Sequence, residues 1–174
     1  MAIEFKPLKK TSVDGTATYE AVRALAERLR AYLDAAPTQE LLRARHVFGA
    51  SSAEIQKVVL EGATPLGFES EKGGLFSEYP VPGLRPDFFC RVNETGILLE
   101  VERGKTTTNN MDLLDLWKCH ICDHARYLFL VVPQERPSAN GRKMRHFSHV
   151  VKRLGPFFEP RNHVNVDAVF LYGY

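Results

Sequence analysis

The feature that most constrains the fold is an unbroken run of six apolar residues, Tyr127–Val132, which ends at Pro133. The run is far shorter than the ~20 residues that a membrane-spanning helix requires. It lacks the alternation of a strand with one solvated face, and it is too apolar for an edge strand. We therefore expect a buried central strand.

Helical and strand patterns alternate along the chain, which predicts an α/β fold with a mixed sheet flanked by helices. Helices are predicted over Thr16–Ala35, Thr38–Val47, Ser52–Leu60, Met111–His124 and Gly141–Leu154. Strands are predicted over Leu66–Ser70, Leu75–Tyr79, Arg85–Val92, Ile97–Glu102, Tyr127–Val132 and Val164–Tyr172. The first 14 residues are predicted to be an arm, so residues 1–50 are an arm with a helical extension and residues 51–174 are the core.

The composition is that of a globular protein. Hydrophobic residues make up 44% of the 174 residues and charged residues 25%, which excludes a disordered or fibrous chain. Three cysteines are too few for a disulfide scaffold. No apolar segment follows the first charges, so we expect no secretory signal, no membrane contact and a cytoplasmic location.

Three acidic residues are expected to meet at one edge of the sheet. Glu100 and Glu102 project from the same face of their strand because side chains alternate along a strand. If Arg85–Val92 pairs antiparallel with that strand through the turn Asn93–Gly96, Asp87 lies roughly opposite Glu102. Three carboxylates would then converge.

Bringing three carboxylates together costs electrostatic free energy, which a bound cation offsets. Two carboxylates ~4 Å apart repel by about 1 kcal/mol in water and about 4 kcal/mol at an effective dielectric constant of 20. Mg²⁺ prefers a few carboxylates together with waters and phosphate oxygens. The alternative is a solvated strand face in which Glu100 and Glu102 form salt bridges with Arg85 or Arg103.

Pro86-Asp87 followed by Glu100-Val101-Glu102 resembles the motif of the PD-(D/E)XK nuclease superfamily, which has the restriction-endonuclease-like fold. The resemblance covers residues 51–132, with the helix Ser52–Leu60 similar to the first helix of the family. It implies that Asp87, Glu100 and Glu102 bind Mg²⁺ or Mn²⁺, and that Glu102 completes the site or activates water. Arg103-Gly104 extends the likeness to an E-x-(D/E)-R-G variant found in mobile elements.

The resemblance also implies two further roles. Glu54 on the first helix would be an accessory acid, with Glu61 as the fallback. The family usually has a lysine at the last position of the motif, where this chain has a glutamate. Lys118 on the following helix is the candidate for a migrated lysine, and Lys105 is its rival. The alternative for Lys118 is a surface ion pair with Asp115 at i,i+3.

A basic segment suits a polyanionic substrate. Arg136–Arg153 contains six basic residues and no acidic one. We expect the predicted helix in this segment to contact DNA phosphates, which gives affinity independent of sequence. The expected contacts are Arg142, Lys143, Arg145, Lys152 and Arg153.

A zinc site is a further alternative. Cys119 and Cys122 are one helical turn apart, and His146 and His149 follow downstream. The spacing differs from that of a zinc finger, where ~12–15 residues separate the pairs, so packing of the cysteines in the core is favoured.

The sequence thus predicts a Mg²⁺-dependent deoxyribonuclease, with an endonuclease as the first expectation. The alternatives are a catalytically silent nucleic-acid-binding module on the same fold and a structural-zinc interaction protein. DNA is the expected partner, and a homodimer is possible. DNA against RNA, sequence preference, and a role in restriction, repair or mobile elements stay open.

Overall fold

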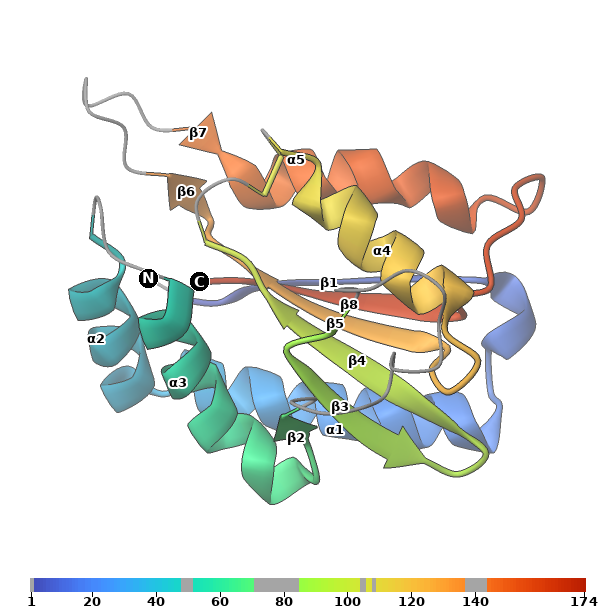
Figure 1. The fold of residues 1–174 in the computed structure, drawn as a ribbon, viewed down its shortest axis with the longest axis horizontal. Coiled ribbons are helices and arrows are strands. Elements are labelled where there is room, and N and C mark those ends of the chain that lie inside the picture. The colour runs from blue at the N-terminus through green and yellow to red at the C-terminus, as the bar shows by residue number, and fades with distance from the viewer. Residues whose placement is uncertain (1, 48–51, 71–84, 104–105, 108, 137–143) are drawn as a thin grey trace.

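A mixed six-stranded sheet forms the middle of the molecule (Figure 1). The computed structural model describes residues 2–47, 52–70, 85–103, 106–107, 109–136 and 144–174. In these residues the strand order of the large sheet is β1-β8-β5-β4-β3-β2. Its strands are β1 (Glu4–Lys9), β2 (Glu69–Ser70), β3 (Phe88–Val92), β4 (Thr95–Val101), β5 (Tyr127–Val132) and β8 (Ala168–Gly173). A separate short pair consists of β6 (Glu135–Arg136) and β7 (Met144–Arg145).

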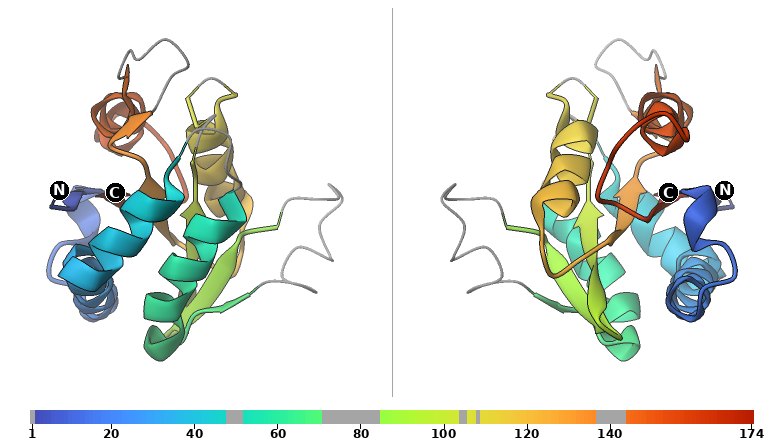
Figure 2. Two further views of the ribbon diagram at one scale, coloured as in Figure 1. Left: turned by 90° about the vertical axis from the view of Figure 1, so that its left-hand side faces the viewer. Right: turned by 90° about the vertical axis from the view of Figure 1, so that its right-hand side faces the viewer.

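Helices cover both faces of the sheet, as Figures 1 and 2 show. One face carries α1 (Ala17–Asp34), α2 (Ala36–Arg45) and α3 (Ser52–Ala63). The other carries α4 (Met111–Ile121) and α5 (His146–Leu154). Short 3₁₀ helices occupy Thr11–Val13, Thr64–Leu66 and Gly155–Phe158. The predicted α/β class with a mixed sheet between helices is therefore confirmed.

The predicted central strand is confirmed in detail. β5 pairs in parallel with β4 on one side and with β8 on the other, and all six of its residues are buried. Side chains alternate between two hydrophobic cores along the neighbouring strand β4. Leu99 and Val101 lie in the core under α1–α3, whereas Leu98 lies in the core under α4 and α5. By the same alternation Glu100 faces α4.

The N-terminal residues form a strand, so the prediction of an arm is wrong for residues 4–9. β1 pairs antiparallel with β8 along its whole length, from Glu4 opposite Gly173 to Lys9 opposite Ala168. Pro7 is compatible with this position because an edge strand leaves one row of backbone N–H groups unpaired. β8 consequently lies inside the sheet, between β1 and β5, and is not an edge strand.

Other predicted elements differ in their bounds. The strand predicted over Leu66–Ser70 is reduced to β2, because a 3₁₀ helix ends at Leu66 and Gly67 follows with a φ of +92°. The last helix begins at His146 and not at Gly141, because Met144 and Arg145 pair with β6. Residues 141–143 and the predicted strand Leu75–Tyr79 lie outside the described residues.

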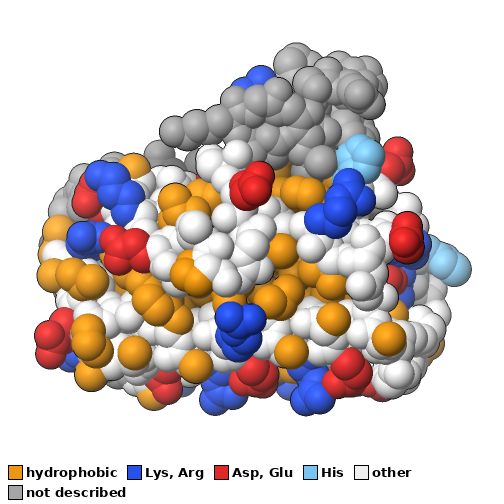
Figure 3. All heavy atoms as spheres, turned by 90° about the horizontal axis from the view of Figure 1, so that it is seen from below, with side chains coloured by type: hydrophobic (Ala, Val, Ile, Leu, Met, Phe, Trp, Pro, Cys, Tyr) orange, Lys and Arg blue, Asp and Glu red, His pale blue; other side chains and the backbone are white. Residues whose placement is uncertain are grey.

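The helices on the α1 face combine apolar contacts with surface charges. Figure 3 shows hydrophobic side chains between charged ones on the face seen from below. Charged residues along α1 pair at i,i+3, as in Glu20–Arg23 and Glu27–Arg30. Within the described residues, no helix is both long enough and apolar enough to span a membrane.

The packing of α1 on α3 depends on a glycine, and we expect Gly62→Ala to destabilise the protein by about 1–3 kcal/mol. A Cβ atom at Gly62 would overlap the ring of Tyr32, whose hydroxyl is held by a 3.0 Å hydrogen bond to the Val58 carbonyl. Urea denaturation measures the change. Gly155→Ala is the matched control, because a Cβ there meets open space. Equal stability of the two variants would contradict this packing.

Candidate functional site

The site begins where β3 starts, beside the end of β4. Phe88 pairs with Leu99, so Asp87 aligns with Glu100 and not with Glu102. The predicted antiparallel hairpin is confirmed, but the predicted register is wrong by two residues. The reason is that only Asn93 and Glu94 separate Val92 from its partner Thr95, with Asn93 in the left-handed region at a φ of 52°.

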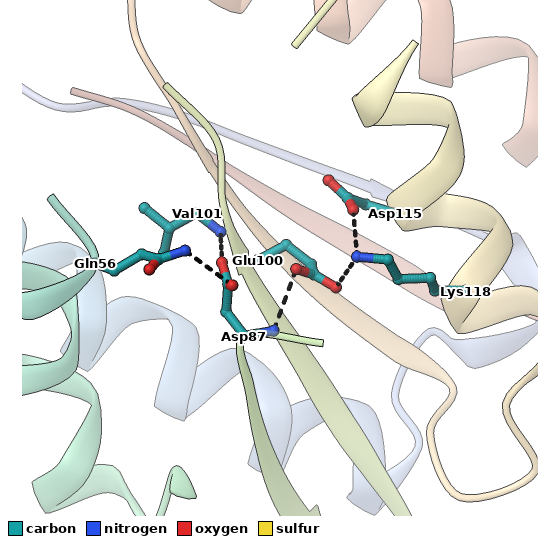
Figure 4. A network of polar contacts seen from close by, with 6 residues as sticks. All are labelled: Gln56, Asp87, Glu100, Val101, Asp115 and Lys118. Atoms are coloured by element: carbon teal, nitrogen blue, oxygen red, sulfur yellow. Dashed lines mark hydrogen bonds and ion pairs between the residues drawn. The ribbon is translucent and has the colours of Figure 1, made fainter. Parts of the chain in front are cut away.

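Asp87 is held by groups from two elements, β4 and α3 (Figure 4). Its Oδ2 accepts a 2.9 Å hydrogen bond from the Val101 N–H of β4. Its Oδ1 accepts a 2.9 Å bond from the Gln56 side-chain amide of α3. The Asp87 backbone N–H donates in turn to Glu100 Oε2 at 3.2 Å. Asp87 thus joins the end of the sheet to α3.

Lys118 connects the same cluster to α4. Its Nζ donates to Glu100 Oε1 at 2.8 Å and to Asp115 Oδ1 at 2.9 Å. All three side chains are buried, with exposed fractions of 9% for Lys118, 4% for Glu100 and 0% for Asp115. The pair with Asp115 anticipated as an alternative does form, but it lies in the interior and includes Glu100.

Glu102 follows the end of β4 and is held through its backbone. Its N–H donates to the Val131 carbonyl at 2.8 Å, and its carbonyl accepts from the Tyr174 hydroxyl at 3.2 Å. Burial raises the pKa of the Glu102 carboxyl to about 8, with further contributions from the negative charges of Asp115 and Asp87. A carboxyl with this pKa changes protonation near neutral pH.

The pKa values of the other carboxyls in the cluster are also shifted. Burial raises the pKa of Asp87 and raises that of Glu100 well above its usual range. Burial raises the pKa of Asp115 to about 6, although Lys118 opposes this shift. Burial lowers the pKa of Lys118, but the carboxylates of Glu100 and Asp115 outweigh it, and the net pKa is raised. Lys118 is therefore a permanent cation.

The raised pKa of Glu102 makes a prediction for stability. Between pH ~5 and 8 the folded protein holds a proton on Glu102 that the unfolded chain has lost, so the free energy of unfolding falls as pH rises through this window. We expect Glu102→Gln to remove about 2 kcal/mol of the fall between pH 6 and pH 8. Urea denaturation at pH 6 and pH 8 measures it. Glu94→Gln, in the exposed β3–β4 turn, is the control, and equal pH dependence in both variants would refute the prediction.

The negative charge of this cluster favours a bound metal cation, but the arrangement of its side chains does not form a complete metal site. Asp87, Glu100, Glu102 and Asp115 surround one lysine, and Asp115 Oδ2 is buried without a hydrogen-bond partner. Yet across the described ranges no three His, Cys, Asp or Glu side chains are arranged to hold one metal ion. Mg²⁺ would therefore rely on one or two carboxylates plus water and substrate oxygens, which is its usual mode of binding.

The structure does not bring the predicted accessory acids into the cluster. Glu54 lies on α3, where its carboxylate pairs with Lys57 at 2.7 Å and is 42% exposed. Glu61 lies further along α3, within 3.5 Å of the Tyr32 hydroxyl. Gln56 occupies the position on α3 that contacts Asp87, and sequence reasoning missed it. Lys105 lies outside the described residues.

The predicted DNA contacts are only partly available at the surface. Arg145 and Lys152 are exposed. Arg153 instead pairs with the buried Asp112 of α4, Nε to Oδ2 at 2.9 Å, and donates to Asn110 at 2.6 Å. It therefore fastens α5 to α4. Arg142 and Lys143 fall in a stretch whose structure is not described.

The four residues of the alternative zinc site differ in their exposure to solvent. Cys119 and Cys122 are buried in the core under α4 and α5. His146 is buried, 3.5 Å from the Thr107 hydroxyl, while His149 is exposed. The cysteines thus pack as the favoured reading predicted.

Two comparisons with known proteins add nothing to this picture. The chain matches no model of a protein family, and a search of curated proteins found no match. The chemistry of the site therefore rests on its own residues.

Proposed function

We propose that the protein is a nuclease that hydrolyses DNA phosphodiesters with Mg²⁺ or Mn²⁺, on a fold of the restriction-endonuclease-like type. One observation carries the proposal: Lys118 reaches from α4 to Glu100, which lies beside Asp87 at one end of the sheet. Two acids from neighbouring strands and a lysine thereby meet in the way that the sequence motif implies. Burying this many carboxyls is costly, which is typical of a functional site.

Asp87, together with Glu100 or Glu102, would hold the metal ion, and water and substrate oxygens would complete its coordination. When bound, the ion would lower the pKa of a water and stabilise negative charge on phosphate oxygens. It would also replace the protons that burial favours on these carboxyls, so its affinity would rise with pH.

The roles of the remaining polar groups follow from their protonation. Lys118 stays charged, so it stabilises negative charge that develops on the phosphate and does not act as a base. Glu102, with a pKa of about 8, is protonated at neutral pH and becomes able to accept the proton of the attacking water as the pH approaches 8. Arg145 and Lys152 are exposed and suited to bind the phosphates of the DNA backbone.

A plasmid-nicking assay tests the proposal. We expect the protein to nick supercoiled DNA with Mg²⁺ or Mn²⁺ and to lose all activity when EDTA is added. Addition of excess Mg²⁺ after EDTA restores the activity. Nicking that persists in EDTA would rule out the proposed chemistry, and so would the absence of cleavage with either metal.

A second candidate is a catalytically silent module that binds nucleic acid. The specific observation in its favour is that both carboxylate oxygens of Asp87 and both of Glu100 already accept hydrogen bonds. Such a module would bind DNA with an affinity that falls with salt and is indifferent to divalent metal. Binding without nicking, unchanged by Mg²⁺, would favour this candidate.

A further inference from the structure

A cavity adjoins the carboxylate cluster on the side of α3. Its volume is about 630 Å³, and both Gln56 and Asp87 line it. Figure 4 shows Gln56 approaching Asp87 from α3, on the side opposite to Lys118. The volume is within the range of about 300–1,000 Å³ that is typical of ligand sites. A base that is paired and stacked in a duplex cannot enter such a pocket unless it is first extruded from the helix.

The walls of the cavity combine apolar and hydrogen-bonding groups. Leu60 of α3 and Pro86 provide apolar surface, while Gln56 and Ser70 provide polar groups. Pockets that take a base out of a nucleic acid strand have this composition, with apolar contact to the base faces and hydrogen bonds to its edge.

Two cations line the same cavity. Arg85 precedes the Pro86-Asp87 pair and is exposed, and Lys57 lies on α3 with an exposed fraction of 65%. Lys57 pairs with Glu54 at 2.7 Å, but an exposed ion pair is weak and exchanges readily for another anion. Both cations can therefore compensate the charge of a phosphate that approaches Asp87.

We propose that this cavity binds one unpaired nucleotide of a DNA strand and places its phosphate beside Asp87. The inference rests on the proposed function and narrows its substrate: the protein selects single-stranded DNA or unpaired ends over intact duplex. Asp87 belongs both to the cavity wall and to the carboxylate cluster, so a nucleotide in the cavity has its backbone next to Asp87.

The test is an equilibrium binding measurement in EDTA, where no cleavage occurs. Fluorescence anisotropy compares a labelled single-stranded oligothymidylate with a duplex of the same length. Ala53→Trp fills the cavity from α3, and Ser70→Trp fills it from β2. We expect each variant to lose about tenfold in affinity for the single strand, the order expected for one stacked base, and to keep its affinity for the duplex.

Ala24→Trp is the matched control, since Ala24 is exposed on α1 away from the cavity. Circular dichroism confirms that each variant is folded, and one folded cavity variant suffices. Equal affinity of wild type and cavity variants for the single strand would overturn the inference. An equal loss for single strand and duplex would also overturn it.

The experiments can refute the hydrolysis reaction and the nucleotide site independently of each other. If the cavity variants lose single-strand binding but the wild type cuts no DNA with either metal, hydrolysis is wrong and the nucleotide site stands. If the wild type nicks DNA and the cavity variants bind single strands normally, the nucleotide site is wrong and hydrolysis stands.

Discussion

Lys118→Met is expected to lower the free energy of unfolding by about 3–5 kcal/mol, which is the cost of removing one partner from a buried ion pair. Lys118 is the cation hydrogen-bonded to both Glu100 and Asp115, and it is 9% exposed. Without it, two buried carboxyls must protonate or remain charged in the interior. Urea denaturation at neutral pH measures the loss.

Two further variants show whether the loss comes from uncompensated charge. Lys118→Met combined with Glu100→Gln and Asp115→Asn is expected to recover most of the stability, because a buried ionic group replaced by neutral side chains is often tolerated. Lys57→Met, whose ion pair with Glu54 is exposed, is the matched lysine control and is expected to change little. A Lys118→Met variant as stable as Lys57→Met would contradict the geometry of the cluster.

The parts of the fold that the sequence predicted are those that local pattern determines. The apolar run Tyr127–Val132 coincides with β5, and the turn at Asn93 joins two antiparallel strands. Thr16 was expected to begin a helix, and its hydroxyl accepts the Tyr19 N–H at the N-terminus of α1. In each case the physical cause acts within a few residues.

The parts that were missed depend on contacts between distant residues. β1 is a strand because β8, more than 150 residues away, offers it a free edge. Its sequence Glu4–Lys9 mixes charges with Pro7, and nothing local distinguishes it from an arm. The start of α5 was missed for the same reason, since β6 draws Met144 and Arg145 into a strand.

The sequence predicted the acidic residues that lie at the strand ends of the candidate site, but it did not predict which residue α3 contributes. Asp87 and Glu100 follow from the motif, whereas the contact from α3 is made by Gln56 and not by Glu54. These two residues flank the buried stripe of Ile55 and Val58 on opposite sides, because each helical residue turns by about 100°. Only the tertiary placement of α3 decides which side faces Asp87.

Asp87→Asn is expected to lower the nicking rate by about 100-fold or more while the melting temperature stays equal or rises. Changes one step removed from a metal already cost about 10–100-fold, and Asp87 is proposed to contact the metal itself. Burial raises the pKa of Asp87, so a neutral side chain of the same shape relieves a cost in the folded state. Asparagine keeps an oxygen for the Val101 N–H, and Gln56 can turn its amide to accept from the new NH₂ group.

Glu54→Gln makes the same chemical change on α3, at a carboxylate that pairs with the exposed Lys57, and should leave nicking unchanged. Plasmid nicking and thermal melting by circular dichroism, measured on the same samples, separate activity from folding. Loss of activity together with unfolding in Asp87→Asn would assign Asp87 a structural role. Full activity in a folded Asp87→Asn would remove it from the reaction. Loss of activity without loss of stability is the result expected for a catalytic carboxylate. The charge of such a group serves the reaction and does not stabilise the folded chain.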